Sequence, residues 1–218
     1  KILKWKQFAG LNEYKPIDLN NLENDLKGDE NKALLKEVAN NTVSIVNNPH
    51  KILPLTTHRN TIVITIGDAT DSRWSSHLGQ DNLLETVIRL DKNASTSRHN
   101  EVIKRITKER NYHTVIISLH QPKIWSQQTA GYTTGDFKFI NQIAALKNTV
   151  VIGFCNPYAL QYISPKATVI AAYEEQSEKE DNIGVMFEYI KGMTLSGLLY
   201  KKEKGKKKKS DITLPLIT

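Results

Sequence analysis

The sequence predicts an α/β fold, a three-layer sandwich on a mostly parallel sheet of five or six strands, preceded by an N-terminal arm. Short β-branched runs recur along the chain, and stretches with helical periodicity separate them. The runs are apolar almost throughout, which is typical of parallel strands that are covered on both faces. Hydrophobic residues make up 39% of the 218 residues, so the chain can bury a sizeable core.

Four runs are the main candidate strands, because Val, Ile and Thr favour extended structure. They span residues 61–66, 113–119, 149–154 and 167–173, and 85–90 is a weaker candidate. Three helices are expected between or after them, with apolar faces at Val102, Ile103 and Ile106, at Phe137, Ile140 and Ala144, and at Ile183, Met186, Phe187 and Ile190. Ser177 and Glu180 have the spacing of a capping box at the start of the last helix.

The chain divides into an arm, residues 1–28, and a sandwich domain, residues 29–218. In the arm Trp5, Phe8, Leu11 and Tyr14 recur every three residues, and Pro16 then ends any helix. We expect this arm to pack on the main domain or on a neighbour outside this sequence.

The sandwich domain is predicted to open with an amphipathic helix. Asp29 is its expected N-cap, because a carboxylate accepts hydrogen bonds from the first free backbone N–H groups. Its apolar face is predicted to carry Leu34, Leu35, Val38, Thr42 and Ile45.

The net charge of +7 is concentrated in one Lys-rich segment, residues 201–209, which holds seven Lys and one Glu. Without it the chain has 23 basic and 22 acidic side chains and is nearly neutral. A lysine block of this kind is typical of a solvated loop or tail, so we expect no nucleic-acid partner. The apolar runs are too short to cross a bilayer, and residues 1–10 lack the apolar core of a signal peptide.

Ligands of open α/β sheets bind beyond the carboxyl ends of the strands. Here those ends are followed by residues 67–71, 120–122, 156–158 and 174–175. The sequence lacks the dinucleotide glycine pattern, the GxxxxGK[ST] phosphate loop, the GxSxG elbow, and the HExxH and CxxC metal patterns. We therefore expect no cofactor and no metal. Cys155 is the only cysteine, which excludes an internal disulfide, and we expect its thiol to be buried.

Aromatic and imidazole side chains at these ends are candidate sugar contacts. His120 ends a strand, and Trp125 and Tyr132 follow in the next loop, where aromatic faces could pack on pyranose rings. The alternative for His120 is a histidine that is hydrogen-bonded in a loop over the sheet.

Two polar residues complete the candidate substrate-binding set. Asn156 precedes Pro157, and it either contacts substrate or caps a helix that begins near Tyr158. Glu174 and Glu175 cannot form a catalytic pair in one cleft, because neighbours in an extended chain point to opposite faces. Glu174 is kept as a substrate-contact candidate, and no residue is assigned as catalytic.

Three motifs, in this order, resemble the carboxyl-terminal domain of family 3 glycoside hydrolases. The first is the run 34–48 closed by Leu53-Pro54-Leu55, which is similar to the family's helix before "L-P-L". The second is 154–160, which is similar to "G-N-P-Y-x-L", and the third is 171–174, which is similar to "V-A-Y-E". The arm also resembles the family's "A-G-L-x-x-Y-x-P" sequence motif. The resemblance spans about residues 2–197 and includes the β-glucosidase type, but it is closest to bacterial β-N-acetylglucosaminidases.

This resemblance implies that the chain is the second domain of a retaining β-N-acetylglucosaminidase. In the family, the nucleophilic Asp and the His acid/base partner are expected on a preceding barrel domain, within a "K-H-F-P-G-H" type region and at a strand-end Asp. None of the six histidines of this sequence lies in such a pattern. The domain is then inactive alone, docks on its barrel and forms one wall of a carbohydrate site, and the parent is an exported bacterial protein. Two departures are Asn47, where the family has Lys, and a closing "G-K-L-P-V" that is only loosely matched at 197–199.

Two other functions stay open on the sequence. One is a self-sufficient α/β domain that binds a small phosphorylated or nucleotide ligand at the strand ends. The other is an interaction module that uses the Lys-rich segment.

Overall fold

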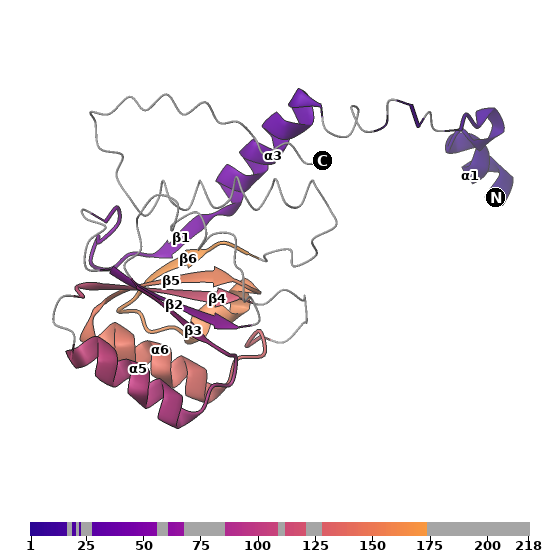
Figure 1. Ribbon diagram of the computed structural model, residues 1–218. Helices are drawn as coiled ribbons and strands as arrows, with labels where there is room; N and C mark the ends of the chain where they lie inside the picture. The colour runs from indigo at the N-terminus through magenta and orange to yellow at the C-terminus, as the bar shows by residue number, and fades with distance from the viewer. Residues whose placement is uncertain are drawn as a thin grey trace, which may run out of the picture.

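The computed structural model describes residues 1–16, 19–20, 22, 28–55, 61–67, 86–108, 112–120 and 128–173. Figure 1 shows the described elements, in which η denotes a short 3-10 helix. In chain order they are α1 (Ile2–Phe8), η1 (Leu11–Glu13), α3 (Asp29–Thr42), β1 (Ser44–Asn47), β2 (Thr61–Gly67), β3 (Thr86–Leu90), α5 (Thr96–Lys108), β4 (Thr114–His120), α6 (Thr134–Leu146), β5 (Asn148–Phe154), η2 (Pro157–Tyr162) and β6 (Thr168–Ala171).

The described strands form one six-stranded sheet in the order β1-β6-β5-β4-β2-β3. The five strands from β2 to β6 pair in parallel, and β1 pairs with β6 in antiparallel orientation at the edge. The predicted α/β class and mostly parallel sheet are thus confirmed, and the weaker strand candidate 85–90 is β3. From β2 the chain runs outward to β3 and then returns to β4 on the other side of β2, so the strand order reverses between β2 and β4.

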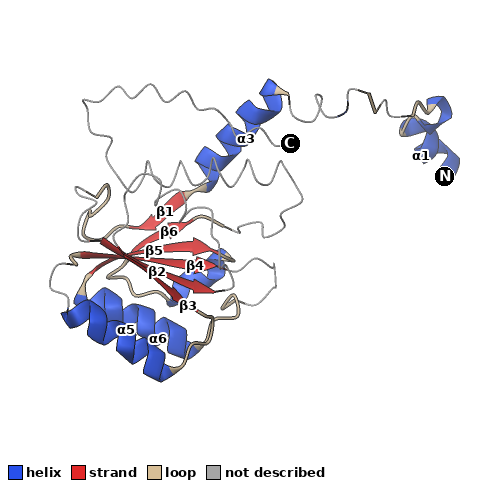
Figure 2. Ribbon diagram, viewed as in Figure 1, coloured by secondary structure: helices blue, strands red, loops and turns tan. Residues whose placement is uncertain are grey.

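Both faces of the sheet are buried. Side chains alternate along each strand, so Ile62, Ile64 and Ile66 of β2 join the core under α5 and α6, whereas Val63 joins a second core on the opposite face. Figure 2 shows α5 and α6 together on one face of the sheet. The second core is equally buried, with Val150, Ile152 and Ile170 fully enclosed. This double burial explains why the strands read as continuous apolar runs.

The helix α6 follows the predicted pattern, with Phe137, Ile140 and Ala144 all buried. In α5 the predicted Val102 and Ile106 are buried, and Ile103 packs against the same core while partly exposed. The predicted helix at 183–190, its capping box and the Lys-rich segment 201–209 lie outside the described residues.

The prediction that Ile45 continues the apolar face of the first helix is wrong. The helix α3 ends at Thr42, and Ile45 lies in β1, where it pairs with Ile170 of β6. The run Thr42 to Val46 is almost entirely β-branched or Ser, which favours a strand once an edge with free backbone groups is within reach. Asp29, the expected N-cap, is the first residue of α3, a difference within the usual uncertainty of helix ends.

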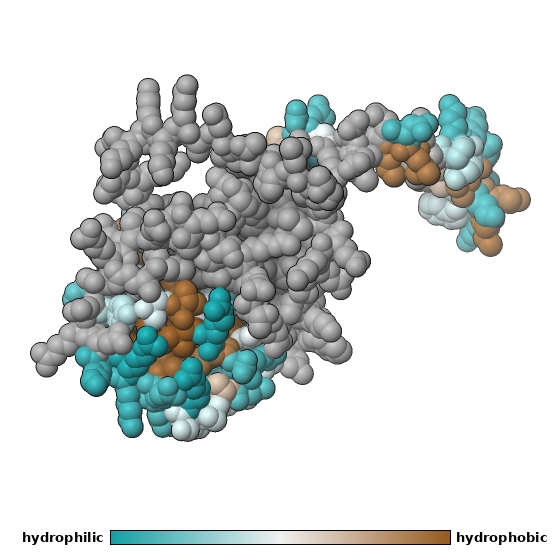
Figure 3. Space-filling model, in the orientation of Figure 1, coloured by the Kyte–Doolittle hydropathy of each residue, from teal (hydrophilic) through white to brown (hydrophobic). Residues whose placement is uncertain are grey.

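The apolar side chains of the arm are exposed in the described structure. Ile2, Leu3, Trp5 and Phe8 are between 68% and 85% exposed, and Figure 3 shows brown, apolar surface around α1. Trp5 and Phe8 contact each other edge-to-face, with ring centroids 5.9 Å apart. The boundary at residue 28 therefore stays a prediction. Within the described part of the chain, no helix has both the length and the apolarity needed to cross a membrane.

Replacing a side chain at the centre of the sheet tests this core. Ile117 of β4 is fully buried beneath the helices. We expect Ile117→Ala to lower the free energy of unfolding by about 2–5 kcal/mol, because it removes apolar contacts and leaves a cavity. Val46→Ala on the edge strand β1, where the side chain is 61% exposed, should change it by less than about 0.5 kcal/mol. Urea unfolding of both variants measures this, and equal effects would contradict the layer assignment.

Candidate functional site at the carboxyl ends of the strands

The reversal of strand order between β2 and β4 marks the place where open α/β sheets bind ligands. Gly67 ends β2, His120 ends β4, and the sheet register pairs these two residues directly. The chain continues from β2 to β3 toward one edge of the sheet and from β4 to β5 toward the other. The residues around these two strand ends form the candidate site.

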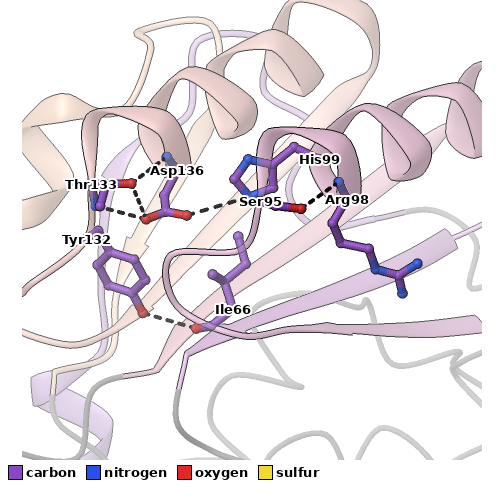
Figure 4. Close-up of polar contacts among 7 residues, drawn as sticks. All are labelled: Ile66, Ser95, Arg98, His99, Tyr132, Thr133 and Asp136. Atoms are coloured by element: carbon purple, nitrogen blue, oxygen red, sulfur yellow. Dashed lines mark hydrogen bonds and ion pairs between the residues drawn. The ribbon is translucent and has the colours of Figure 1, made fainter.

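The side chain of Tyr132 fills this point of the sheet. Its hydroxyl donates a shared hydrogen bond to two backbone carbonyl oxygens, that of Ile66 at 3.0 Å and that of His120 at 2.9 Å. Figure 4 shows the ring of Tyr132 reaching from the start of α6 toward Ile66. The ring is 3% exposed, and the ammonium of Lys92 lies 5.7 Å from its centroid, within cation–π range. Tyr132 thus ties the ends of β2 and β4 together.

This arrangement requires glycine at the end of β2. Gly67 has φ +124°, a region that side chains disfavour. A Cβ at Gly67 would lie 2.1 Å from the carbonyl oxygen of His120 and 3.1 Å from the hydroxyl of Tyr132. The strand end and the Tyr132 hydroxyl therefore approach each other only because Gly67 lacks a side chain.

The imidazole of His120 is enclosed beneath the site. It is 1% exposed, stacks on Phe154 with centroids 4.9 Å apart, and its Nε2 lies 2.8 Å from the hydroxyl of Ser118. The ring packs on the sheet face opposite α5 and α6, since Phe154 belongs to the second core. Its geometry corresponds to the hydrogen-bonded histidine that the sequence left as the alternative.

Asn156 lies one strand away, directly after β5. Its Oδ1 accepts a hydrogen bond from the backbone N–H of Tyr158 at 3.1 Å, so it caps η2. The predicted helix near Tyr158 is thus this short 3-10 helix. Of the five candidate contacts, Tyr132 meets the backbone carbonyl of His120, whose ring packs on the other face of the sheet. Asn156 follows the neighbouring strand, and Trp125 and Glu174 lie outside the described residues.

A buried network that the sequence analysis missed anchors the start of α6. Thr133 is the N-cap, and its N–H and hydroxyl donate to Oδ2 of Asp136 at 2.8 and 2.7 Å. The Asp136 N–H donates in return to the Thr133 hydroxyl at 3.2 Å, which completes a capping box. The Thr-x-x-Asp spacing was the available sequence signal.

Asp136 also faces a histidine on the neighbouring helix, as Figure 4 shows. Its Oδ1 lies 3.6 Å from Nε2 of His99 in α5, which is ion-pair range but too long for a hydrogen bond. Neither atom has a hydrogen-bond partner in the described structure. Burial lowers the pKa of His99 from its ordinary value of 6.5, while the charge of Asp136 acts in the opposite direction.

The described residues contain no group of three or more His, Cys, Asp or Glu side chains placed to hold a metal ion. Cys155, which follows β5, is fully buried, as its position in an apolar run predicted.

Solved structures with a similar fold are enzymes that act on β-glucosides. A β-glucosidase from Listeria innocua in complex with gluconolactone matches with a TM-score of 0.58 and 18% identity over 89% of this chain. A mutant β-glucosidase from the same organism, in complex with laminaribiose, matches with a TM-score of 0.58 and 17% identity over 89%. The β-glucoside phosphorylase BglX matches with a TM-score of 0.54 and 17% identity over 88%.

These similarities establish a shared fold. The chain spans 29% of each of the two Listeria chains and 34% of the phosphorylase chain, so about a third of the length of each neighbour. No family model and no curated protein matches the sequence.

Removing the hydroxyl that bridges β2 and β4 tests the role of Tyr132. We expect Tyr132→Phe to lower the free energy of unfolding by about 1–3 kcal/mol, because two buried carbonyl oxygens lose their shared donor. Tyr158→Phe is the control, since Tyr158 is 67% exposed. Urea unfolding of the two variants gives the comparison. A Tyr132→Phe protein as stable as wild type would show that the bridge contributes nothing.

The lowered pKa of His99 makes stability depend on pH. Near pH 6.5, the ordinary pKa of a histidine, His99 binds more protons in the unfolded chain than in the folded protein. The free energy of unfolding therefore rises with pH. We expect the free energy of unfolding to fall between about pH 7.5 and about pH 5.5, and less so in His99→Phe, which keeps the stacking on Phe139. Urea unfolding across this range measures the slope. If acidification instead raised the free energy of unfolding of the wild type relative to that of His99→Phe, His99 would be charged and paired with Asp136 in the folded protein.

Proposed function

We propose that this chain is the second domain of a family 3 glycoside hydrolase, in which it packs on a preceding barrel domain and forms one wall of the carbohydrate site. The observation that carries the proposal is the shared fold with β-glucoside-active enzymes over 88–89% of the chain, while about two thirds of each neighbour lies outside the match. The ordered motifs at 34–55, 154–160 and 171–174 support the same family.

The proposed wall is the edge where the parallel strands end. Tyr132 and His120 are part of its rigid base, because both are buried and tied to the last residues of β2 and β4. Asn156 lies at the next strand end, partly exposed beside its cap on η2. Trp125 and Glu174, outside the described residues, complete the proposed substrate contacts. No catalytic residue is assigned to this chain, because the bond-breaking groups belong to the barrel in this proposal.

The proposed substrate is a β-linked N-acetylglucosaminide, and the mechanism retains configuration through an enzyme-bound intermediate. The sequence motifs support the amino sugar, because they resemble those of bacterial β-N-acetylglucosaminidases most closely. The solved neighbours, in contrast, are β-glucosidases and a β-glucoside phosphorylase. A fold similarity at 17–18% identity does not distinguish the two sugars. The parent is proposed to be an exported bacterial protein that acts on cell-wall glycans, with this domain and the barrel as obligatory partners.

The chain by itself and the chain joined to its barrel should differ in activity. We expect the 218 residues alone to release no chromophore from p-nitrophenyl N-acetyl-β-glucosaminide or from p-nitrophenyl β-glucoside. The full parent protein should cleave the first faster than the second. The ratio of the two kcat/KM values measures the sugar preference.

Each outcome bears on a separate part of the proposal. Turnover by the purified 218-residue chain, abolished by one substitution within it, would overturn the assignment of catalysis to the barrel. A parent that prefers the glucoside would overturn the amino-sugar specificity and leave the family assignment standing. A parent that cleaves neither would overturn the hydrolase function.

A further inference from the structure

A groove of about 710 Å³ lies on the outer side of α6, next to η2. It adjoins the strand-end edge through Tyr132, whose hydroxyl turns to the sheet while its ring contacts Phe137 edge-on, with centroids 6.1 Å apart. The volume is within the range of small-molecule sites. Neither the motif analysis nor the proposed wall accounts for this groove.

An aromatic surface forms one side of the groove. The rings of Phe137 and Tyr162 pack at 37° with centroids 5.0 Å apart. Phe137 is 7% exposed and so forms the base, whereas Tyr162 is 39% exposed and presents part of its ring to solvent. A partly open aromatic ring on a packed base offers a flat apolar face to a ligand.

Polar side chains surround this aromatic surface. Thr129, Thr134 and Lys138 line the groove, and their hydroxyl and ammonium groups make no hydrogen bond within the described part of the chain. The two threonine hydroxyls can donate and accept hydrogen bonds, whereas the lysine ammonium can only donate them. Among the described residues that line the groove, none is acidic and Lys138 is the one cation, so this part of the lining is largely neutral.

The side chain of Asn141 holds Tyr162 in place relative to α6. Its Nδ2 donates to the carbonyl oxygen of Tyr162 at 2.9 Å, and its Oδ1 accepts from the N–H of Ser164 at 2.7 Å. The Asn141 amide thus binds two backbone groups in the segment that follows η2, one at Tyr162 and one at Ser164. The aromatic surface is therefore preorganised, which lowers the entropy cost of binding a ligand there.

We propose that this groove is a non-catalytic binding site for a pyranose unit of a β-linked oligosaccharide. The apolar face of the sugar ring packs on Tyr162, and its equatorial hydroxyls exchange hydrogen bonds with Thr129, Thr134 and Lys138. A sugar fits because it combines a flat C–H face with a rim of neutral donors and acceptors, which matches the groove's aromatic side and polar rim. Asn141 is a positioning residue. The choice of a β-linked sugar rests on the proposed function, and the site adjoins the strand-end wall through Tyr132, which belongs to both.

Titration of the 218-residue chain with chitotriose and with laminaritriose tests the site. Binding is followed by calorimetry and by NMR shifts of the Thr129 and Thr134 amides. We expect saturable binding of at least one sugar in the millimolar range. Tyr162→Ala should weaken it by about tenfold or more, because the ring face is the main apolar contact. Tyr158→Ala is the matched control, since Tyr158 is on the same 3-10 helix, is 67% exposed and does not line the groove.

Two further variants separate binding from folding. Thr134→Val should weaken binding without changing the urea unfolding midpoint, because Thr134 is exposed and unbonded in the described structure. Asn141→Ala should weaken binding, and Asn141→Asp, which keeps the acceptor for Ser164, should weaken it less. No saturable binding of either sugar, or equal loss in Tyr158→Ala and Tyr162→Ala, would overturn the proposal.

The outcomes also separate this site from the proposed function. A parent enzyme that cleaves its substrate while the groove binds neither sugar would reject the site alone. Sugar binding that Tyr162→Ala abolishes, in a chain whose parent cleaves no glycoside, would support the site and reject the hydrolase function.

Discussion

The hydrogen bond that the Tyr132 hydroxyl shares between the ends of β2 and β4 is the contact on which the rest of the site depends. At this point the strand order reverses, and the hydroxyl joins the last carbonyl groups of two paired strands. The bond requires Gly67, because any side chain there would overlap the carbonyl of His120. Since Tyr132 immediately precedes the N-cap of α6, the same bond sets where that helix begins.

Both surfaces to which we assign a function follow from this placement of α6. One is the strand-end edge, which Tyr132 closes from the helix side. The other is the groove behind it, where Phe137 of α6 supports the ring of Tyr162. Asp136 and His99 also bring two buried polar atoms of α6 and α5 within 3.6 Å of each other, without a hydrogen bond between them.

The carbohydrate function is proposed from the shared fold and the motifs, but the fold does not identify the sugar. At 17–18% identity, the likeness to β-glucosidases lies in the path of the backbone and carries no site residue across. The proposed amino-sugar specificity depends on the sequence motifs alone. The groove is independent of both, because its aromatic side and neutral polar rim are properties of this chain.

The sequence by itself determined the five parallel strands, since β-branched apolar runs such as 61–66 are typical of strands that are buried on both faces of a sheet. It also determined the buried faces of α5 and α6, because helical periodicity assigns them locally. Tertiary structure decided the conformation of Ile45, which lies in a strand because β1 pairs with the edge of β6. It also decided the roles of Tyr132 and Asn141, whose partners Ile66 and Tyr162 lie 66 and 21 residues away. No local pattern encodes such pairings, because they exist only once the strands and helices have packed.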